Sequence, residues 1–153
     1  MKRIILILLL APCSLLLCQA QQGLHINDIF EGRLIDKEKM EESLVRGDNL
    51  AQYKLQVLHT VKFAANDKER AKADALFSRD MEGRISDDES NMEMESHNGH
   101  IYYAIVQLTD SQKGRHRYIC YQCKEKSSHY DITLVYMEGK ATLADLRKSF
   151  KKK

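Results

Sequence analysis

The sequence predicts an α+β fold, with a mostly antiparallel sheet of about five strands and two helices packed on one face of it. Three apolar runs of β-like composition lie between residues 100 and 137, and connections of hairpin length separate them. Two earlier runs, at residues 42–46 and 54–65, complete the set of strands. Helix start signals stand at residues 66 and 142. Strands joined as hairpins, with helices gathered on one side, are typical of α+β proteins.

The first half of the chain predicts a short helical turn at residues 23–32 and then two strands. Residues 54–65 alternate with period two, which is typical of a strand with one buried and one wet face. Leu55, Val57, Val61 and Phe63 fall on the apolar face, and His59 falls among them. Leu58 is an apolar exception on the wet face.

Two capping boxes predict the helices. Asn66 can accept a hydrogen bond from the backbone of Glu69, and the Glu69 side chain can reach back, so a helix is expected from there to about residue 82. Thr142 and Asp145 repeat the pattern at the start of the second helix. Residues 84–98 are polar and acidic, and we expect them to form a mobile loop.

Three strands are expected in the second half of the chain. Residues 100–108 are apolar on both faces, as in a central strand. Residues 115–122 follow as the hairpin partner, and residues 130–137 form the last strand.

The first twenty residues have the order of a cleavable signal peptide. A basic start at Lys2 and Arg3 precedes an apolar stretch, and small residues precede a cleavage point at Ala20. We therefore expect export to the periplasm or the extracellular space, with residues 21–153 as a single α+β domain. A lipoprotein acylated at Cys18 is the less favoured alternative, because the large Leu17 stands where a small residue is needed.

The expected mature chain is formally neutral. The whole chain has 24 basic and 22 acidic residues, and removal of Lys2 and Arg3 leaves 22 of each. A neutral chain gives no global electrostatic reason to bind nucleic acid. After the leader no apolar stretch is long enough for a transmembrane segment.

Cys120 and Cys123 form a disulfide, a thiol-active pair or two idle thiols. In an extended strand they point to opposite faces, so a disulfide needs a turn or bulge between them. A redox site needs the first cysteine at a helix start, and the residues that follow Cys123 open no convincing helix. His116 and His129 could complete a zinc site, but their spacing fits no recognised finger. The sequence favours a structural disulfide or idle thiols.

The histidines and carboxylates predict no catalytic, cofactor or metal site. His59 is expected as a core or rim histidine of its strand. His97 and His100, beside the acidic residues 87–95, could bind a divalent ion, but the spacing misses the oxygen pattern of a calcium loop. A solvated acidic loop is the better interpretation.

Six tyrosines cluster on the last three strands, and some of them could line a groove for a protein, peptide or glycan partner. Tyr103, Tyr118, Tyr121 and Tyr130 are the candidate binding surface, and core packing is the competing interpretation.

Several segments resemble a family of short secreted proteins of Bacteroidetes that is known only as a domain of unknown function. They read GLHINDIFEGR, VRGDNLAQYKL, HIYYAIVQL, RYICYQC and ITLVYMEGKATLADLRK. The resemblance implies export and a single domain, and it assigns no activity, cofactor or site residue. The function expected is that of a non-enzymatic binding module of the cell envelope. A thiol-active or thiol-regulated envelope protein that uses Cys120 and Cys123 is the alternative. The sequence does not indicate an oligomeric state.

Overall fold

The computed structural model describes residues 23–84, 91–109 and 114–150. The expected signal peptide, at residues 1–20, lies outside this part of the chain. The elements follow in the order α1 (Asn27–Phe30), the 3₁₀ helix η3 (Lys37–Lys39), β1 (Met40–Arg46), the 3₁₀ helix η4 (Gly47–Tyr53), β2 (Leu55–Ala65), α2 (Asp67–Arg84), β3 (Met92–His97), β4 (His100–Leu108), β5 (His116–Glu125), β6 (Tyr130–Gly139) and α3 (Leu143–Phe150).

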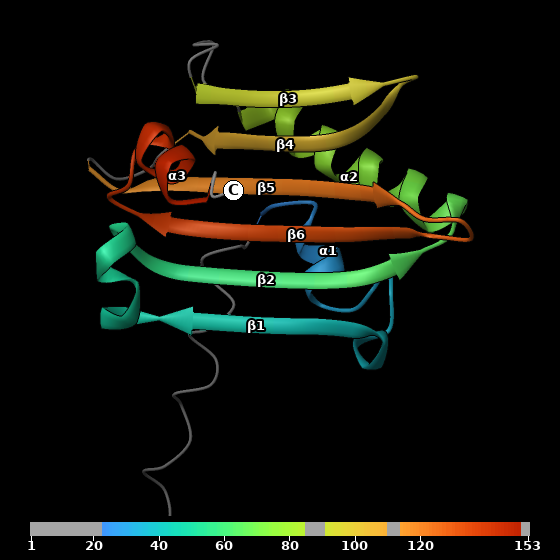
Figure 1. Cartoon of the computed structure of the whole chain (residues 1–153), viewed down its shortest axis with the longest axis horizontal. Coiled ribbons are helices and arrows are strands. Elements are labelled where there is room, and N and C mark those ends of the chain that lie inside the picture. Colours follow the sequence, from blue (N-terminus) through green and yellow to red (C-terminus); the bar gives the residue numbers. More distant parts are fainter. Residues whose placement is uncertain (1–22, 85–90, 110–113, 151–153) are drawn as a thin grey trace, which may run out of the picture.

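The strands form one sheet in the order β1-β2-β6-β5-β4-β3, and every neighbouring pair is antiparallel (Figure 1). Strands β3 to β6 follow one another as a meander, which returns from one edge of the sheet to its middle. Helix α2 connects β2, in the middle, with β3, at the edge. The predicted α+β class and the antiparallel pairing are confirmed.

The prediction of about five strands is wrong, because the sheet has six. The additional strand is β3, which lies inside the segment expected as a mobile acidic loop, while residues 85–90 of that segment lie outside the described part. An edge strand pairs on one side only, and most side chains of β3 are exposed. It therefore needs no apolar alternation, and its charged residues suit an unpaired edge.

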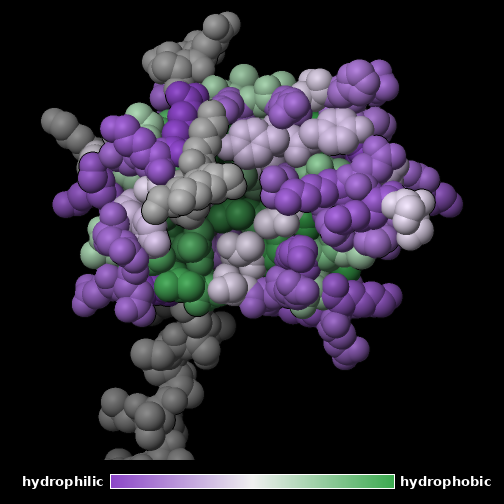
Figure 2. Space-filling view, in the orientation of Figure 1, coloured by the Kyte–Doolittle hydropathy of each residue, from purple (hydrophilic) through white to green (hydrophobic). Residues whose placement is uncertain are grey.

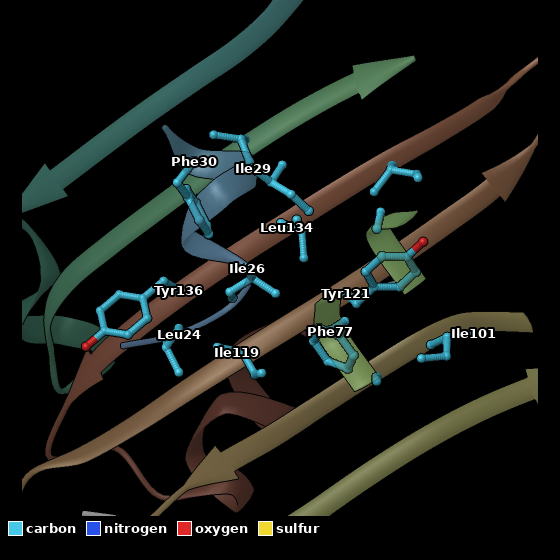
Figure 3. Close-up of a cluster of buried hydrophobic side chains, with 14 of the residues drawn as sticks. Leu24, Ile26, Ile29, Phe30, Phe77, Ile101, Ile119, Tyr121, Leu134 and Tyr136 are labelled. Carbon is cyan, nitrogen blue, oxygen red and sulfur yellow. The ribbon is translucent and has the colours of Figure 1, made fainter. Parts of the chain in front are cut away.

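One face of the sheet is covered by α1 and α2, which pack on it around the larger hydrophobic core (Figure 3). Ile26 and Ile29 of the α1 region and Phe77 of α2 are fully buried there. They meet inward side chains of four strands, among them Val61, Ala104, Ile119, Tyr121, Ile132, Leu134 and Tyr136. The ring of Phe77 lies 5.3 Å from that of Tyr121, centroid to centroid.

The opposite face holds a second, smaller core under α3 and η4. Leu143 and Leu146 of α3 pack there with Tyr118 and Met137, whereas Tyr121 belongs to the first core. The expectation that both long helices share one face is therefore wrong, and Figure 1 shows α2 behind the sheet and α3 in front of it. The physical reason is the apolar character of the central strands on both faces, which needs cover on both sides.

Both capping boxes are confirmed. The Asn66 side chain accepts hydrogen bonds from the backbone N–H groups of Lys68 and Glu69, both at 3.0 Å, and the Glu69 carboxylate accepts from the Asn66 N–H at 2.9 Å. At the start of α3, the Thr142 hydroxyl accepts from the Asp145 N–H at 3.2 Å, and the Asp145 carboxylate accepts from the Thr142 N–H at 2.9 Å.

Candidate functional site

The candidate site is the part of the α3-side face that the described residues leave half-exposed. Alternation along the strands places one set of side chains on this face. Leu58, Tyr103, Cys120 and Val135 pack against the smaller core, and Thr60, Gln122 and Thr133 lie two positions from Leu58, Cys120 and Val135. We call six uncharged, half-buried members of this set the open face: Leu58, Thr60, Tyr103, Gln122, Thr133 and Val135.

The strand register makes the open face continuous. Thr60 lies opposite Val135 across β2 and β6, and Thr133 lies opposite Gln122 across β6 and β5. Gln122 in turn lies opposite Tyr103 of β4. Because neighbouring strands are about 4.8 Å apart, these side chains form one surface across four strands. In Figure 2 hydrophobic surface lies below and to the left of the middle of this face and reaches its lower edge, with hydrophilic residues on either side.

The charged side chains of this face lie at its margin. Arg147 of α3 donates from Nε to Glu93 of the edge strand β3 at 2.8 Å. On the other side, Lys62 of β2 lies 3.8 Å from Glu41 of the edge strand β1. The six residues of the open face are uncharged, and two charged residues adjoin them: Lys62 lies directly opposite Thr133, and Asp131 lies two positions before Thr133 on β6. An uncharged centre inside a charged margin is the composition found where proteins dock on one another.

The structure does not bring the four candidate tyrosines together. Only Tyr103 belongs to the open face, and burial, followed by Cys120 and Glu93, raises the pKa of its hydroxyl. Tyr118 is fully buried in the smaller core, where its hydroxyl donates to the carbonyl of Ala141 at 2.8 Å. Tyr121 and Tyr130 face the α2 side, and Tyr121 is fully buried.

Cys120 and Cys123 are free thiols that point to opposite faces of β5. Cys120 packs against the smaller core, and Cys123 belongs to the larger one. Burial raises the pKa of the Cys120 thiol to about 12. The pKa of Cys123 is raised as well, mainly by burial. A thiol that stays protonated in neutral solution is a poor nucleophile, so the arrangement lacks the chemistry of a thiol-active pair.

This raised pKa predicts slow alkylation of the folded protein. At pH 8 a thiol with a pKa of about 12 is ionised to about one part in 10⁴, against about one part in ten at the ordinary value of 9.0. Iodoacetamide should therefore label Cys120 about 10³-fold more slowly in the native chain than in urea, as peptide mass spectrometry would show. Equal rates in the two states would reveal a reactive thiol and restore the thiol-active alternative.

A buried polar cluster on the opposite side of the sheet was missed at the level of sequence. Its centre is Asp74 of α2, which accepts a hydrogen bond from the Tyr121 hydroxyl at 2.5 Å and pairs with Nδ1 of His100 at 3.1 Å. Arg70, one turn earlier, places its guanidinium 4.3 Å from the ring centre of Tyr130 and 3.9 Å, at Nε, from Asp74 Oδ2. No sequence signal joins these residues, because they come from four separate elements.

The position of His59 agrees with its prediction as a core or rim histidine. His59 lies at the rim of the larger core, with its ring 4.5 Å from that of Phe30 and Nε2 2.7 Å from the Glu42 carboxylate. Burial lowers the pKa of His59. Among the described residues no group of three or more histidine, cysteine, aspartate or glutamate side chains could hold a metal ion.

The open face contains one residue that the sequence marks and several that it does not. Leu58 breaks the alternation of its strand, and this apolar exception indicates that the face expected to be solvated is partly covered. Thr60, Gln122 and Thr133 have no such signal, since threonine and glutamine suit any solvated strand.

Comparison with known proteins gives a family and no function. The model of a family described as "Family of unknown function (DUF6108)" matches residues 13–150. No curated protein and no solved structure matches the chain. Within the described residues, none of the helices has the length and apolar character that crossing a membrane requires.

Proposed function

This chain belongs to DUF6108, a family of unknown function, and we propose that it is an exported, non-enzymatic interaction module that docks a protein partner on the open face. The observation that carries the proposal is the uncharged, half-buried surface across β2, β6, β5 and β4. The other face of the same sheet is packed under α1 and α2 around the larger core.

The composition of the open face supports a protein as the partner. Leu58 and Val135 supply apolar area, Tyr103 supplies an aromatic ring with a polar end, and Thr133 and Gln122 supply hydrogen-bonding groups. Protein interfaces combine these kinds of side chain at their centre and exclude charge to the rim. A glycan platform needs several exposed aromatic rings, and of the four candidate tyrosines only Tyr103 lies on this face.

The sheet edges are weaker candidates for docking. An extended peptide can add a strand to an exposed edge, as β-augmentation does. Here β1 carries Glu41 and Glu42, and β3 has a shift of register between Glu95 and Ser96. Charges and irregular pairing are the features by which edge strands avoid unwanted pairing.

The export part of the proposal rests on the basic, apolar and small-residue order of residues 1–20. N-terminal sequencing of the chain recovered from its natural compartment tests it. Gln21 as the first residue supports export with cleavage, and an intact start at Met1 contradicts it.

Site-specific photo-crosslinking in intact cells tests the docking surface. A photoreactive side chain is placed at Thr133 or Gln122 of the full chain, and at Lys72, exposed on α2, as the matched control. We expect a discrete crosslinked product of one size from positions 133 and 122 and none from position 72. Products of equal yield from all three positions, or no product from 133 and 122, would contradict the proposal.

A further inference from the structure

The hairpin between β3 and β4 places two histidines side by side at its tip. Its loop has two residues, Asn98 and Gly99, which both adopt positive φ angles, of 52° and 77°. This is the conformation of a type I′ turn. His97 and His100 are cross-strand partners that close the turn. Directly opposed residues of an antiparallel pair lie about 5 Å apart and have their side chains on the same face.

His100 is held with one ring nitrogen toward the protein. Its Nδ1 lies 3.1 Å from the Asp74 carboxylate, which can only accept a hydrogen bond, so Nδ1 carries the proton. Nε2 is then the nitrogen with the free electron pair. Asp74 is itself fixed, because the Tyr121 hydroxyl donates to its other oxygen at 2.5 Å.

This arrangement has the form of the outer shell around a metal-bound histidine. Histidine ligands of metal ions almost always donate their second ring nitrogen to a carboxylate or carbonyl, which fixes the ring and strengthens the ligand. The His100 side chain is 46% exposed, whereas that of Asp74 is 12% exposed. His97 is exposed. An ion from solution can therefore approach the histidines while the carboxylate stays behind them.

We propose that His97 and His100 form a two-histidine site for a divalent transition-metal ion of the Zn²⁺, Cu²⁺ and Ni²⁺ class. Imidazole nitrogen is a ligand that these ions favour, whereas Mg²⁺ and Ca²⁺ prefer oxygen. Because the described residues provide no third side-chain ligand, water fills the remaining positions. The site lies on the α2 side of the sheet, so it is separate from the open face and independent of partner docking.

Calorimetric titration of the purified mature chain with Zn²⁺ tests the site, once any affinity tag has been removed. We expect one ion per chain, and at least about tenfold weaker binding after either His97→Gln or His100→Gln. Asp74→Asn should weaken binding by about tenfold while leaving both ligands in place, as removal of an outer-shell partner does. His25→Gln, at another exposed histidine, is the matched control and should leave the affinity unchanged.

His97→Gln decides the matter even if Asp74→Asn disturbs folding, because His97 is exposed at a turn. Electron paramagnetic resonance of the Cu²⁺-loaded chain gives a second readout, with two nitrogen ligands expected in the wild type and one in His97→Gln. Zinc affinity that survives both histidine substitutions, or that His25→Gln removes equally, would overturn the proposal.

Discussion

Replacing Asp80 by alanine is expected to lower the free energy of unfolding by about 3 kcal/mol. Asp80 lies on α2, is fully buried, and accepts hydrogen bonds from the backbone N–H groups of His25 and Ile26, at 2.7 and 2.8 Å. These are donors at the start of α1 that have no partner inside the helix. Alanine would remove the acceptor of both N–H groups. A buried, unpaired donor costs about 1–3 kcal/mol, which applies in full to the buried bond of Ile26 and in part to the part-buried bond of His25.

Urea denaturation of three variants measures this effect. Asp80→Asn keeps one acceptor oxygen and should cost about half as much as Asp80→Ala. Glu82→Ala, at an exposed position of the same helix, should change the free energy by less than about 0.5 kcal/mol. Equal stability of Asp80→Ala and Glu82→Ala would show that α1 is not held to α2 through this carboxylate.

Replacing Gly139 by alanine is expected to lower the free energy of unfolding by about 3 kcal/mol as well. A β-carbon at Gly139 would lie 2.4 Å from the carbonyl oxygen of Lys54 and 2.6 Å from the Cα of Leu55. Both are backbone atoms, so no side chain can move aside. The same Lys54 carbonyl accepts hydrogen bonds from the N–H groups of Lys140 and Ala141, at 2.8 and 3.0 Å. The substitution would therefore separate the end of β6 from the start of β2.

Gly47→Ala provides the comparison, because a β-carbon there meets nothing within 4 Å. Gly47 has a φ of 76°, so alanine should cost only the backbone strain, about 1 kcal/mol. Thermal unfolding of the two variants separates strain from collision. If Gly139→Ala is no less stable than Gly47→Ala, the close approach of β2 and β6 at Gly139 is not a constraint on the fold.

A buried face makes a strand easiest to predict, although the sequence also predicts β1, at residues 42–46, without one. The period-two alternation of residues 54–65 predicts β2, and the apolar run at 100–108 predicts β4. Both patterns arise because the buried side chains of these strands are apolar. Strand β3 has no buried face, so its sequence shows no such pattern. Its Met92–His97 segment alternates methionine and glutamate and reads as a polar loop.

The distribution of helices over the two faces could have been predicted in part. Residues 100–108 are apolar on both faces, and a strand of this kind needs cover on both sides. What the sequence does not contain is the side that each helix takes. The capping box at Thr142 fixes where α3 starts, but the turn at Gly139–Ala141 decides on which face it packs.

For the candidate site, the sequence predicts only which residues lie on opposite faces of a strand. Spacing by three residues already places Cys120 and Cys123, or Tyr118 and Tyr121, on opposite faces of a strand. It does not say which face stays open. That depends on the length of α3, which covers one end of its face and leaves Thr133 and its neighbours half-exposed.

The affinity of the crosslinked partner for purified variants tests the docking surface most directly. Thr133→Arg puts a charge on the open face, between Gln122 and Lys62 of the neighbouring strands, and Lys72→Glu changes a charge on exposed α2. With both variants as stable as the wild type, we expect Thr133→Arg to raise the Kd at least about tenfold, which corresponds to about 1.4 kcal/mol, and Lys72→Glu to leave it unchanged. An unchanged Kd for Thr133→Arg, or an equal loss in both variants, would contradict docking on the open face.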